Sequence, residues 1–300
     1  MSVGVDHLAI LDRIRGWAGL PRTSQPLGGG ITNRNHLVQI GMETVVVRIP
    51  AETGKLLGID RRVEHEASLL AAASGVGPEV VAFLEPEGIL VTRFIHGEAV
   101  SDAAVHLPDT LRRVAESLRL IHHAGLVPAG FSPFRVGEAY AVTATQRGVQ
   151  LPAAHERALQ IAVAVEQALP VLPPLLCHND LLNANFIDDG QLIRIVDWEY
   201  AGMGDPMFDL GNFAVNHELA GDEQAYLLEA YAGGASAARL AHLRLMCVMS
   251  DYREAMWGVV QQGISDLDFD FAGYAARHFD RLLASAGRPE FNDWLRQARP

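Results

Sequence analysis

Hydrophobic and polar residues alternate over short segments in the first third of the chain, which is typical of β-strands. Asp60–Ala73 instead carries apolar residues at helical spacing, and so does Leu8–Trp17. The pattern therefore predicts a small antiparallel sheet that carries one helix, preceded by a second helical segment. The strands are expected at His36–Ile40, Thr44–Ile49, Val80–Leu84 and Ile89–Phe94.

From about residue 100 onward the apolar spacing is mainly helical. Three short apolar stretches in the middle are the exception, since they are too short for helices and are separated by polar loops. They predict a small hairpin that bears functional loops, and they lie at Leu175–His178, Asn185–Ile187 and Leu192–Val196. Helices are expected at Leu111–His123, Ala153–Leu169, Asp222–Ala232, Ala237–Gln262 and Ala272–Ala286. We therefore expect an α+β chain in two lobes, residues 1–95 and 96–300.

The composition supports a folded chain with a large core. It has 300 residues, of which 49% are hydrophobic and 20% charged, and it contains no apolar run of about 18 residues. Cys177 and Cys247 are the two cysteines and form no CxxC pair, which suits a reducing compartment. We expect a cytoplasmic protein with no membrane partner.

The charge is concentrated in the second lobe. Residues 1–95 hold 9 basic and 10 acidic side chains, whereas residues 96–300 hold 15 and 26. An acidic field repels nucleic acid and attracts metal ions or cationic substrates, although solubility alone would also account for it. We therefore expect a small-molecule partner and no nucleic acid, while the oligomeric state is left open.

Asp180, Asn185 and Asp197 form the most informative pattern in the chain. Asp180 follows His178 by two residues, Asn185 lies five residues further on, and Asp197 follows after twelve more. Phosphoryl transfer requires a carboxylate that accepts the proton of the acceptor and oxygen ligands that hold Mg²⁺ across the phosphates. The spacing therefore predicts Asp180 as the base, with Asn185 and Asp197 as magnesium ligands. The alternative is a solvated loop with ordinary capping residues, which the flanking apolar strands disfavour.

A glycine run precedes the first predicted hairpin and would let the chain approach phosphates closely. Gly28, Gly29 and Gly30 have no side chains in the way, although a flexible turn explains the run equally well. Protein kinases add a lysine on the following strand, paired with a helix glutamate. Here that place is held by Arg48, because the single lysine, Lys55, lies beyond the strand. We expect Arg48 to bind phosphate. A solubilising charge on an edge strand is the alternative, and Glu64 or Glu66 is the expected partner.

Several longer motifs surround these residues, at positions 178–185, 197–201, 204–206, 208–212 and 252–257, the last with the sequence YREAMW. They closely resemble the choline and ethanolamine kinase family, especially its bacterial members, with the aminoglycoside phosphotransferases as wider relatives. The resemblance extends from the glycine run through Arg48, Glu64 and Pro78 to the segment YREAMW, so it covers most of the chain.

This resemblance implies a bilobal protein-kinase-like fold with a small antiparallel sheet lobe and a larger, mainly helical lobe. It implies ATP in the cleft with adenine against the connection at 93–95, Asp180 as the base, and Asn185 and Asp197 as Mg²⁺ ligands. It further implies that Glu199 contributes to a second metal and that Asp209 supports the catalytic loop. The expected nucleotide-binding residues are Gly28, Gly29, Gly30, Thr32, Asn33, Arg48, Arg93, Phe94 and Ile95.

The acceptor site is expected beside Asp180, with Trp257 at the place of a tryptophan in the choline pocket. Glu254 stands one turn earlier, where eukaryotic members usually have a second tryptophan, and spacing of i and i+3 puts both on one helix face. Core packing is the alternative for Trp257. Choline, ethanolamine or a similar amino alcohol is therefore the expected acceptor. Two alternatives are another acceptor, such as an aminoglycoside or thiamine, and a nucleotide-binding regulator without turnover.

Overall fold

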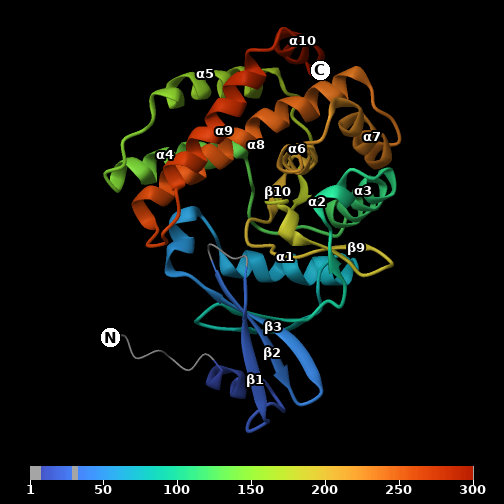
Figure 1. The fold of residues 1–300 in the computed structure, drawn as a ribbon, viewed down its shortest axis with the longest axis vertical. Coiled ribbons are helices and arrows are strands. Elements are labelled where there is room, and N and C mark those ends of the chain that lie inside the picture. The colour runs from blue at the N-terminus through green and yellow to red at the C-terminus, as the bar shows by residue number, and fades with distance from the viewer. Residues whose placement is uncertain (1–7, 29–32, 300) are drawn as a thin grey trace.

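The structure is a computed structural model that describes residues 8–28 and 33–299. A strand-rich part at one end is followed by a larger helical part, as Figure 1 shows. The five-stranded antiparallel sheet has the order β1-β2-β3-β5-β4. Its strands are β1 (Arg22–Leu27), β2 (Asn33–Ile40), β3 (Glu43–Pro50), β4 (Val80–Leu84) and β5 (Ile89–Arg93). The four strands expected from the alternation are thus confirmed, with β1 in addition.

Alternation along β3 decides which face of the sheet is available for function. Val45, Val47 and Ile49 are buried and pack in a cluster with residues of the other strands. Because neighbouring side chains of a strand point to opposite faces, Val46 and Arg48 lie on the other side. The sheet core therefore places the Arg48 side chain toward the helical part.

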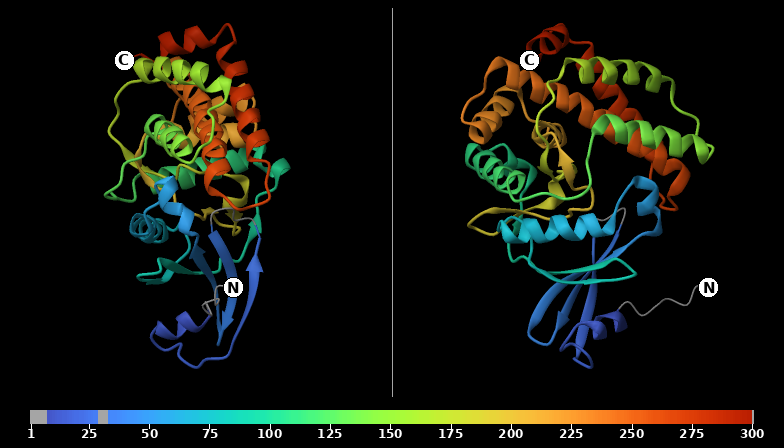
Figure 2. Two further views of the ribbon diagram at one scale, coloured as in Figure 1. Left: turned by 90° about the vertical axis from the view of Figure 1, so that its left-hand side faces the viewer. Right: turned by 180° about the vertical axis from the view of Figure 1, so that it is seen from behind.

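Helix α1 (Arg61–Ala73) lies between the sheet and the helical part in all three views (Figures 1 and 2). Its N-cap is Asp60, whose carboxylate accepts hydrogen bonds from the N–H groups of Arg62 and Val63. The buried face includes Glu64, which lies among small residues of the same helix. The expected helix at Leu8–Trp17 is wrong in length. Only a 3-10 helix, η1 (Ala9–Arg13), forms there, because Ile14 is extended and ends it.

The helical part is organised around α8 (Ala237–Ile264), in which most residues from 241 to 261 are buried. The five expected helices are present, and their ends differ from the expectation by no more than three residues. The other four are α3 (Pro108–His122), α5 (Ala153–Ala168), α7 (Gly221–Ala232) and α9 (Phe271–Ala286). Four more were not expected, α2 (Asp102–Val105), α4 (Pro133–Gln146), α6 (Pro206–Asn216) and α10 (Phe291–Gln297). Among the described residues, no helix is both long and apolar enough to cross a bilayer.

Short strands in the middle of the chain carry the expected hairpin. β8 (Phe186–Asp188) pairs with β9 (Ile193–Ile195), and β6 (Glu98–Ala99) adds to the free edge of β8. The expectation that the first apolar stretch, Leu175–His178, belongs to this hairpin is wrong. β7 (Leu175–Cys177) pairs instead with β10 (Gly202–Gly204), a glycine-containing segment without a strand pattern. The chain thus leaves the large sheet at Arg93 and joins the small one at Glu98, while the division at residue 95 stays a prediction.

Helices α6 and α8 meet at Gly211, and this contact gives a test of the fold. A Cβ atom at Gly211 would lie 2.8 Å from the backbone N of Cys247 and 2.8 Å from the backbone C of Met246. We expect Gly211→Ala to lower the free energy of unfolding by about 1–3 kcal/mol, because overpacking outweighs the gain in helix propensity. Urea unfolding followed by circular dichroism measures this. The control Gly234→Ala, where nothing lies within 4 Å of the new atom, should change stability little. Equal stability of both variants would contradict close packing here.

Candidate active site

A cavity of about 280 Å³ lies between the sheet and the β8–β9 hairpin. Val46, Leu90 and Ile187 give it apolar walls, while Arg48 and Asp197 are charged. Of the expected nucleotide-binding and metal residues, those that line it are Gly28, Arg48, Arg93, Phe94, Ile95, Asn185 and Asp197. Gly29, Gly30 and Thr32 lie outside the described residues. The cavity therefore joins residues that are more than 160 positions apart in the sequence.

Two residues of the connection between the lobes are already engaged with the sheet. The guanidinium of Arg93 pairs with the carboxylate of Glu43 at 2.6 Å. The N–H of Phe94 donates to the carbonyl oxygen of Thr44 at 3.0 Å. The N–H of Phe94 is thus already paired, and the contribution of these residues as nucleotide contacts stays a prediction.

Arg48 connects three elements through a single nitrogen atom. Its Nη1 donates to Oε1 of Glu64 on α1 at 2.8 Å and to Oδ1 of Asp197 at 2.6 Å. Burial acts to lower the pKa of Arg48, but the carboxylates of Asp197 and Glu64 outweigh it and raise the pKa. Glu64 is thus the partner of Arg48, while Glu66 is exposed on the opposite face of α1.

Arg61 is a site residue that the sequence analysis did not identify. Its Nη1 donates to Oε2 of Glu64 at 2.7 Å and to Oε2 of Glu199 at 3.0 Å. Asn33 completes this cluster, since its Nδ2 donates to the same oxygen of Glu199 at 2.8 Å and its Oδ1 accepts from Nη2 of Arg61 at 2.9 Å. Asn33 therefore contacts Glu199 and is not among the residues that line the 280 Å³ cavity. The sequence offered one signal for Arg61, namely its position three residues before Glu64 on the predicted helix.

Glu199 is buried, and burial raises the pKa of its carboxyl group, with Asp197 adding to the effect. One of its oxygens accepts from both Asn33 and Arg61. A contribution to a second metal would compete with these contacts, and this role of Glu199 stays a prediction.

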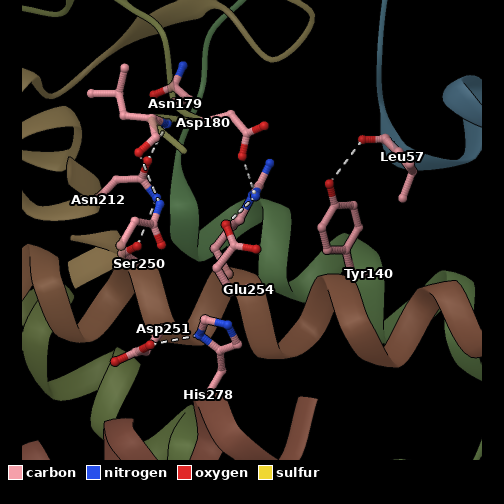
Figure 3. Close-up of polar contacts among 12 residues, drawn as sticks. Leu57, Tyr140, Asn179, Asp180, Asn212, Ser250, Asp251, Glu254 and His278 are labelled. Carbon is pink, nitrogen blue, oxygen red and sulfur yellow. Dashed lines mark hydrogen bonds and ion pairs between the residues drawn. The ribbon is translucent and has the colours of Figure 1, made fainter. Parts of the chain in front are cut away.

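The loop after β7 is held by a buried carboxylate, as the resemblance implied for Asp209. The two oxygens of Asp209 accept hydrogen bonds from the backbone N–H groups of His178 and Asn179, both at 2.7 Å. Asn179 has φ 68°, a conformation that glycine and asparagine adopt at least cost. Asparagine therefore suits this position. Asn212, labelled in Figure 3, holds the loop two residues further on, because its Oδ1 accepts from the N–H of Leu181 at 2.6 Å.

Asn185 and Asp197 have the chemistry of a site for a hard divalent cation. Nδ2 of Asn185 donates to the backbone oxygen of Asp180 at 2.9 Å, so the amide nitrogen is engaged and the carboxamide oxygen is the atom suited to a metal. The N–H of Val196 donates to the carbonyl of Asn185 at 3.0 Å, which brings the neighbouring Asp197 close. Both residues line the same cavity. One carboxylate and one carboxamide, completed by phosphate oxygens and water, fit Mg²⁺.

Asp180 lies almost buried on the other side of this loop, next to an arginine from α8. Its Oδ1 accepts from Nη1 of Arg253 at 3.1 Å, and the same nitrogen contacts Oε1 of Glu254. The dashed lines from Asp180 and Glu254 in Figure 3 meet at this guanidinium. Burial raises the pKa of Asp180 to about 8; Arg253 opposes this shift and the Glu254 carboxylate adds to it.

The expected acceptor residues lie together on α8. The hydroxyl of Tyr274 donates to Oε2 of Glu254 at 2.7 Å, and the ring of Trp257 lies 5.4 Å from the ring of Tyr274. Both residues thus face α9, which confirms the expectation that they share a helix face. Trp257 is 7% exposed and also packs against Phe271, so it forms part of an aromatic cluster. Arg253 was not identified from the sequence, although it directly precedes Glu254.

Comparison with known proteins agrees with this geometry. The model of the phosphotransferase enzyme family matches residues 23–245. A solved structure of a choline/ethanolamine kinase family protein from Mesorhizobium loti is 32% identical, with a TM-score of 0.83 and coverage of 97% of each chain. Mouse ethanolamine kinase 1 is 27% identical over 92% of this chain and 87% of its own length. Choline kinase LicA from Streptococcus pneumoniae shares the fold, with 22% identity, a TM-score of 0.73 and coverage of 87% of this chain and 93% of its own.

The fold and the matches define the class: the chain belongs to the phosphotransferase enzyme family and, within it, to the choline/ethanolamine kinase family. The chain is thus of the ATP-dependent phosphotransferase type that acts on alcohol groups. The family resemblance found in the motifs and the expected protein-kinase-like fold are both confirmed.

The raised pKa of Asp180 predicts a pH-dependent stability difference. An unfolded aspartate has a pKa of about 3.9, so folding disfavours the ionised form of Asp180. The contribution of Asp180 to the free energy of unfolding of the wild type is therefore lost as pH rises from about 4 through about 8. We expect the stability of Asp180→Asn relative to wild type to increase by at least about 1 kcal/mol between pH 5 and pH 8.5. Urea unfolding in EDTA measures it. Asp266→Asn, at an exposed position, should show no such trend, and a pH-independent difference for Asp180→Asn would contradict the shift.

Proposed function

We propose that this protein transfers the γ-phosphate of ATP to the hydroxyl of a small amino alcohol. One observation carries the proposal. The backbone oxygen of Asp180 contacts Asn185, which lines the cavity, while the carboxylate of Asp180 contacts Arg253, next to Glu254 on α8. Asp180 thus links the side proposed for the phosphate donor with the side proposed for the alcohol acceptor.

The nucleotide would occupy the 280 Å³ cavity, with its base between the apolar walls and its phosphates toward Arg48. Arg48 keeps its charge at any physiological pH and has the planar fork that binds phosphate oxygens. Its contacts with Glu64 and Asp197 hold it in place. Asn185 and Asp197 would hold Mg²⁺, which neutralises the charge of the phosphates when bound.

The acceptor hydroxyl would lie at Asp180. The carboxylate of Asp180, in its ionised form, receives the proton of that hydroxyl. The hydroxyl oxygen forms the new bond to the γ-phosphorus, the bond to the β–γ bridging oxygen breaks, and ADP leaves. Because burial raises the pKa of Asp180, its carboxylate is more basic than an exposed one and better suited to hold that proton.

An amino-alcohol acceptor is supported by the α8 side of the site and by the relatives. Glu254 is a buried carboxylate, and the rings of Trp257 and Tyr274 adjoin it, a combination that favours an ammonium group. The relatives include proteins named ethanolamine kinase and choline kinase. We also propose a cytoplasmic location, since both cysteines are unpaired.

An acceptor panel in a coupled assay for ADP release tests this function. We expect magnesium-dependent turnover with amino alcohols such as ethanolamine or choline and little with thiamine or kanamycin. Asp180→Asn should lower turnover at least about a hundredfold while leaving ATP affinity nearly unchanged, because base catalysis and positioning contribute that much. ATP binding without ADP release for any alcohol would favour a nucleotide-binding regulator, and turnover confined to thiamine or kanamycin would favour another acceptor class.

Arg48→Ala tests the phosphate contact. We expect at least about tenfold weaker ATP binding by calorimetry, because a charge-assisted contact to phosphate is lost. Arg48→Lys, which keeps the charge, should bind ATP with intermediate affinity. The control Arg112→Ala removes an exposed arginine of α3 and should leave ATP affinity unchanged. A change in acceptor KM alone would count against the assignment.

A further inference from the structure

The guanidinium of Arg253 has more donors than the described part of the chain uses. Arg253 is 1% exposed, and its Nη1 serves both Asp180 and Glu254. Its Nε and Nη2 atoms are buried and have no hydrogen-bond partner among residues 8–28 and 33–299. Buried donors are nearly always paired in folded proteins. These two nitrogen atoms therefore point to a partner that the chain itself does not supply.

The two unpaired nitrogen atoms form one edge of the planar group. Nε and Nη2 donate in parallel, and this edge matches the two oxygens of a carboxylate or phosphate. Arg253 is also fixed in place, because Nη1 is held by two carboxylates and Cζ lies 4.4 Å from the centre of the Tyr200 ring. The edge is thus preorganised for an oxyanion, which lowers the entropic cost of binding one.

Arg253 lies on the side of the site proposed for the acceptor. Nη1 is 3.1 Å from an oxygen of Asp180, and the neighbouring residue is Glu254. No residue of α8 lines the 280 Å³ cavity assigned to the nucleotide. Tyr200, which lies against Arg253, also lines a second cavity of about 480 Å³ together with Tyr140 and Glu199. The ring of Tyr200 thus connects the guanidinium of Arg253 with a cavity large enough for a small molecule.

Charge favours an acceptor with groups of both signs. A plain cation leaves the Nε and Nη2 atoms of Arg253 without a partner. A molecule with both an ammonium group and an oxyanion supplies that partner. Its ammonium can lie near Glu254 and the aromatic rings, while its oxyanion takes the free edge of Arg253.

We propose that Arg253 selects a zwitterionic acceptor, an amino alcohol that also carries a carboxylate, as a hydroxy amino acid does. This inference rests on the proposed phosphotransfer to an amino alcohol and narrows its substrate class. Arg253 binds and orients the acceptor and takes no part in the bonds that form or break.

Two matched pairs of acceptors test the proposal in the wild-type enzyme. L-Serine is ethanolamine with a carboxylate on the carbon that bears the amine, and L-homoserine is 3-amino-1-propanol with the same addition. We expect the carboxylated member of at least one pair to have a kcat/KM at least about tenfold higher, as a bidentate charged contact provides. A preference for the member without the carboxylate in both pairs overturns the proposal, whether or not any variant folds.

Arg253→Lys keeps the positive charge and removes the bidentate edge. We expect it to lower kcat/KM at least about tenfold for the preferred carboxylated acceptor and no more than about threefold for its partner, so that the preference is lost. Arg281→Lys is the matched control, since Arg281 pairs with Asp251 outside the site, and its preference should equal that of wild type. An equal loss for both members of each pair would assign Arg253 to the transferred phosphoryl group or to Asp180, and the proposal would be wrong.

Thermal shift with the same four compounds separates this inference from the proposed function. Should no compound be phosphorylated, the proposed function fails. In that case, stabilisation of wild type by the carboxylated compounds, absent in Arg253→Lys, would still support the oxyanion site. Phosphorylation of ethanolamine or choline without any carboxylate preference would leave the function standing and reject the inference.

Discussion

The contact of one Arg48 nitrogen with both Glu64 and Asp197 is the interaction on which the arrangement of the site depends. It joins the central strand of the sheet, the helix beside it and the loop after β9, which lies in the helical part. Separating one partner would leave a buried charge uncompensated, and this is costly in a protein interior. The pairing therefore fixes the sheet relative to the loop that bears Asp197, and the 280 Å³ cavity forms where they meet.

Two other arginines of the site also contact two carboxylates each. Arg61 joins Glu64 to Glu199, and Arg253 joins Asp180 to Glu254. A planar guanidinium can hold two carboxylates at fixed angles, whereas an ammonium group on a flexible stem is a point charge. The use of arginine for 23 of the 24 basic residues suits a site built in this way. Each arginine also keeps neighbouring carboxylates from repelling one another.

The fold could be predicted wherever the hydrophobic residues of a segment repeat with a clear period. β2, β3 and the long helix α8 each display a clear pattern, and each was expected within a few residues of its observed ends. α4 and α6 were missed because their buried residues are few or include polar groups. Both begin with proline after a capping residue, Ser132 or Asp205, and this start signal was available in the sequence. β10 has no such signal, since Gly202 to Gly204 becomes a strand only by pairing with β7.

The sequence alone determined the part of the site that depends on spacing. Asp180, Asn185 and Asp197 lie on one loop and hairpin, so short distances along the chain bring them together, and the family motifs identified the class of enzyme. Tertiary structure alone decided which buried polar groups pair, as in the contact of Asn33 with Glu199 or of Asp180 with Arg253, 166 and 73 positions apart. The reason is physical. Local geometry follows from the backbone and its nearest neighbours, whereas the partner of a buried charge is set by packing between elements that are distant in the sequence.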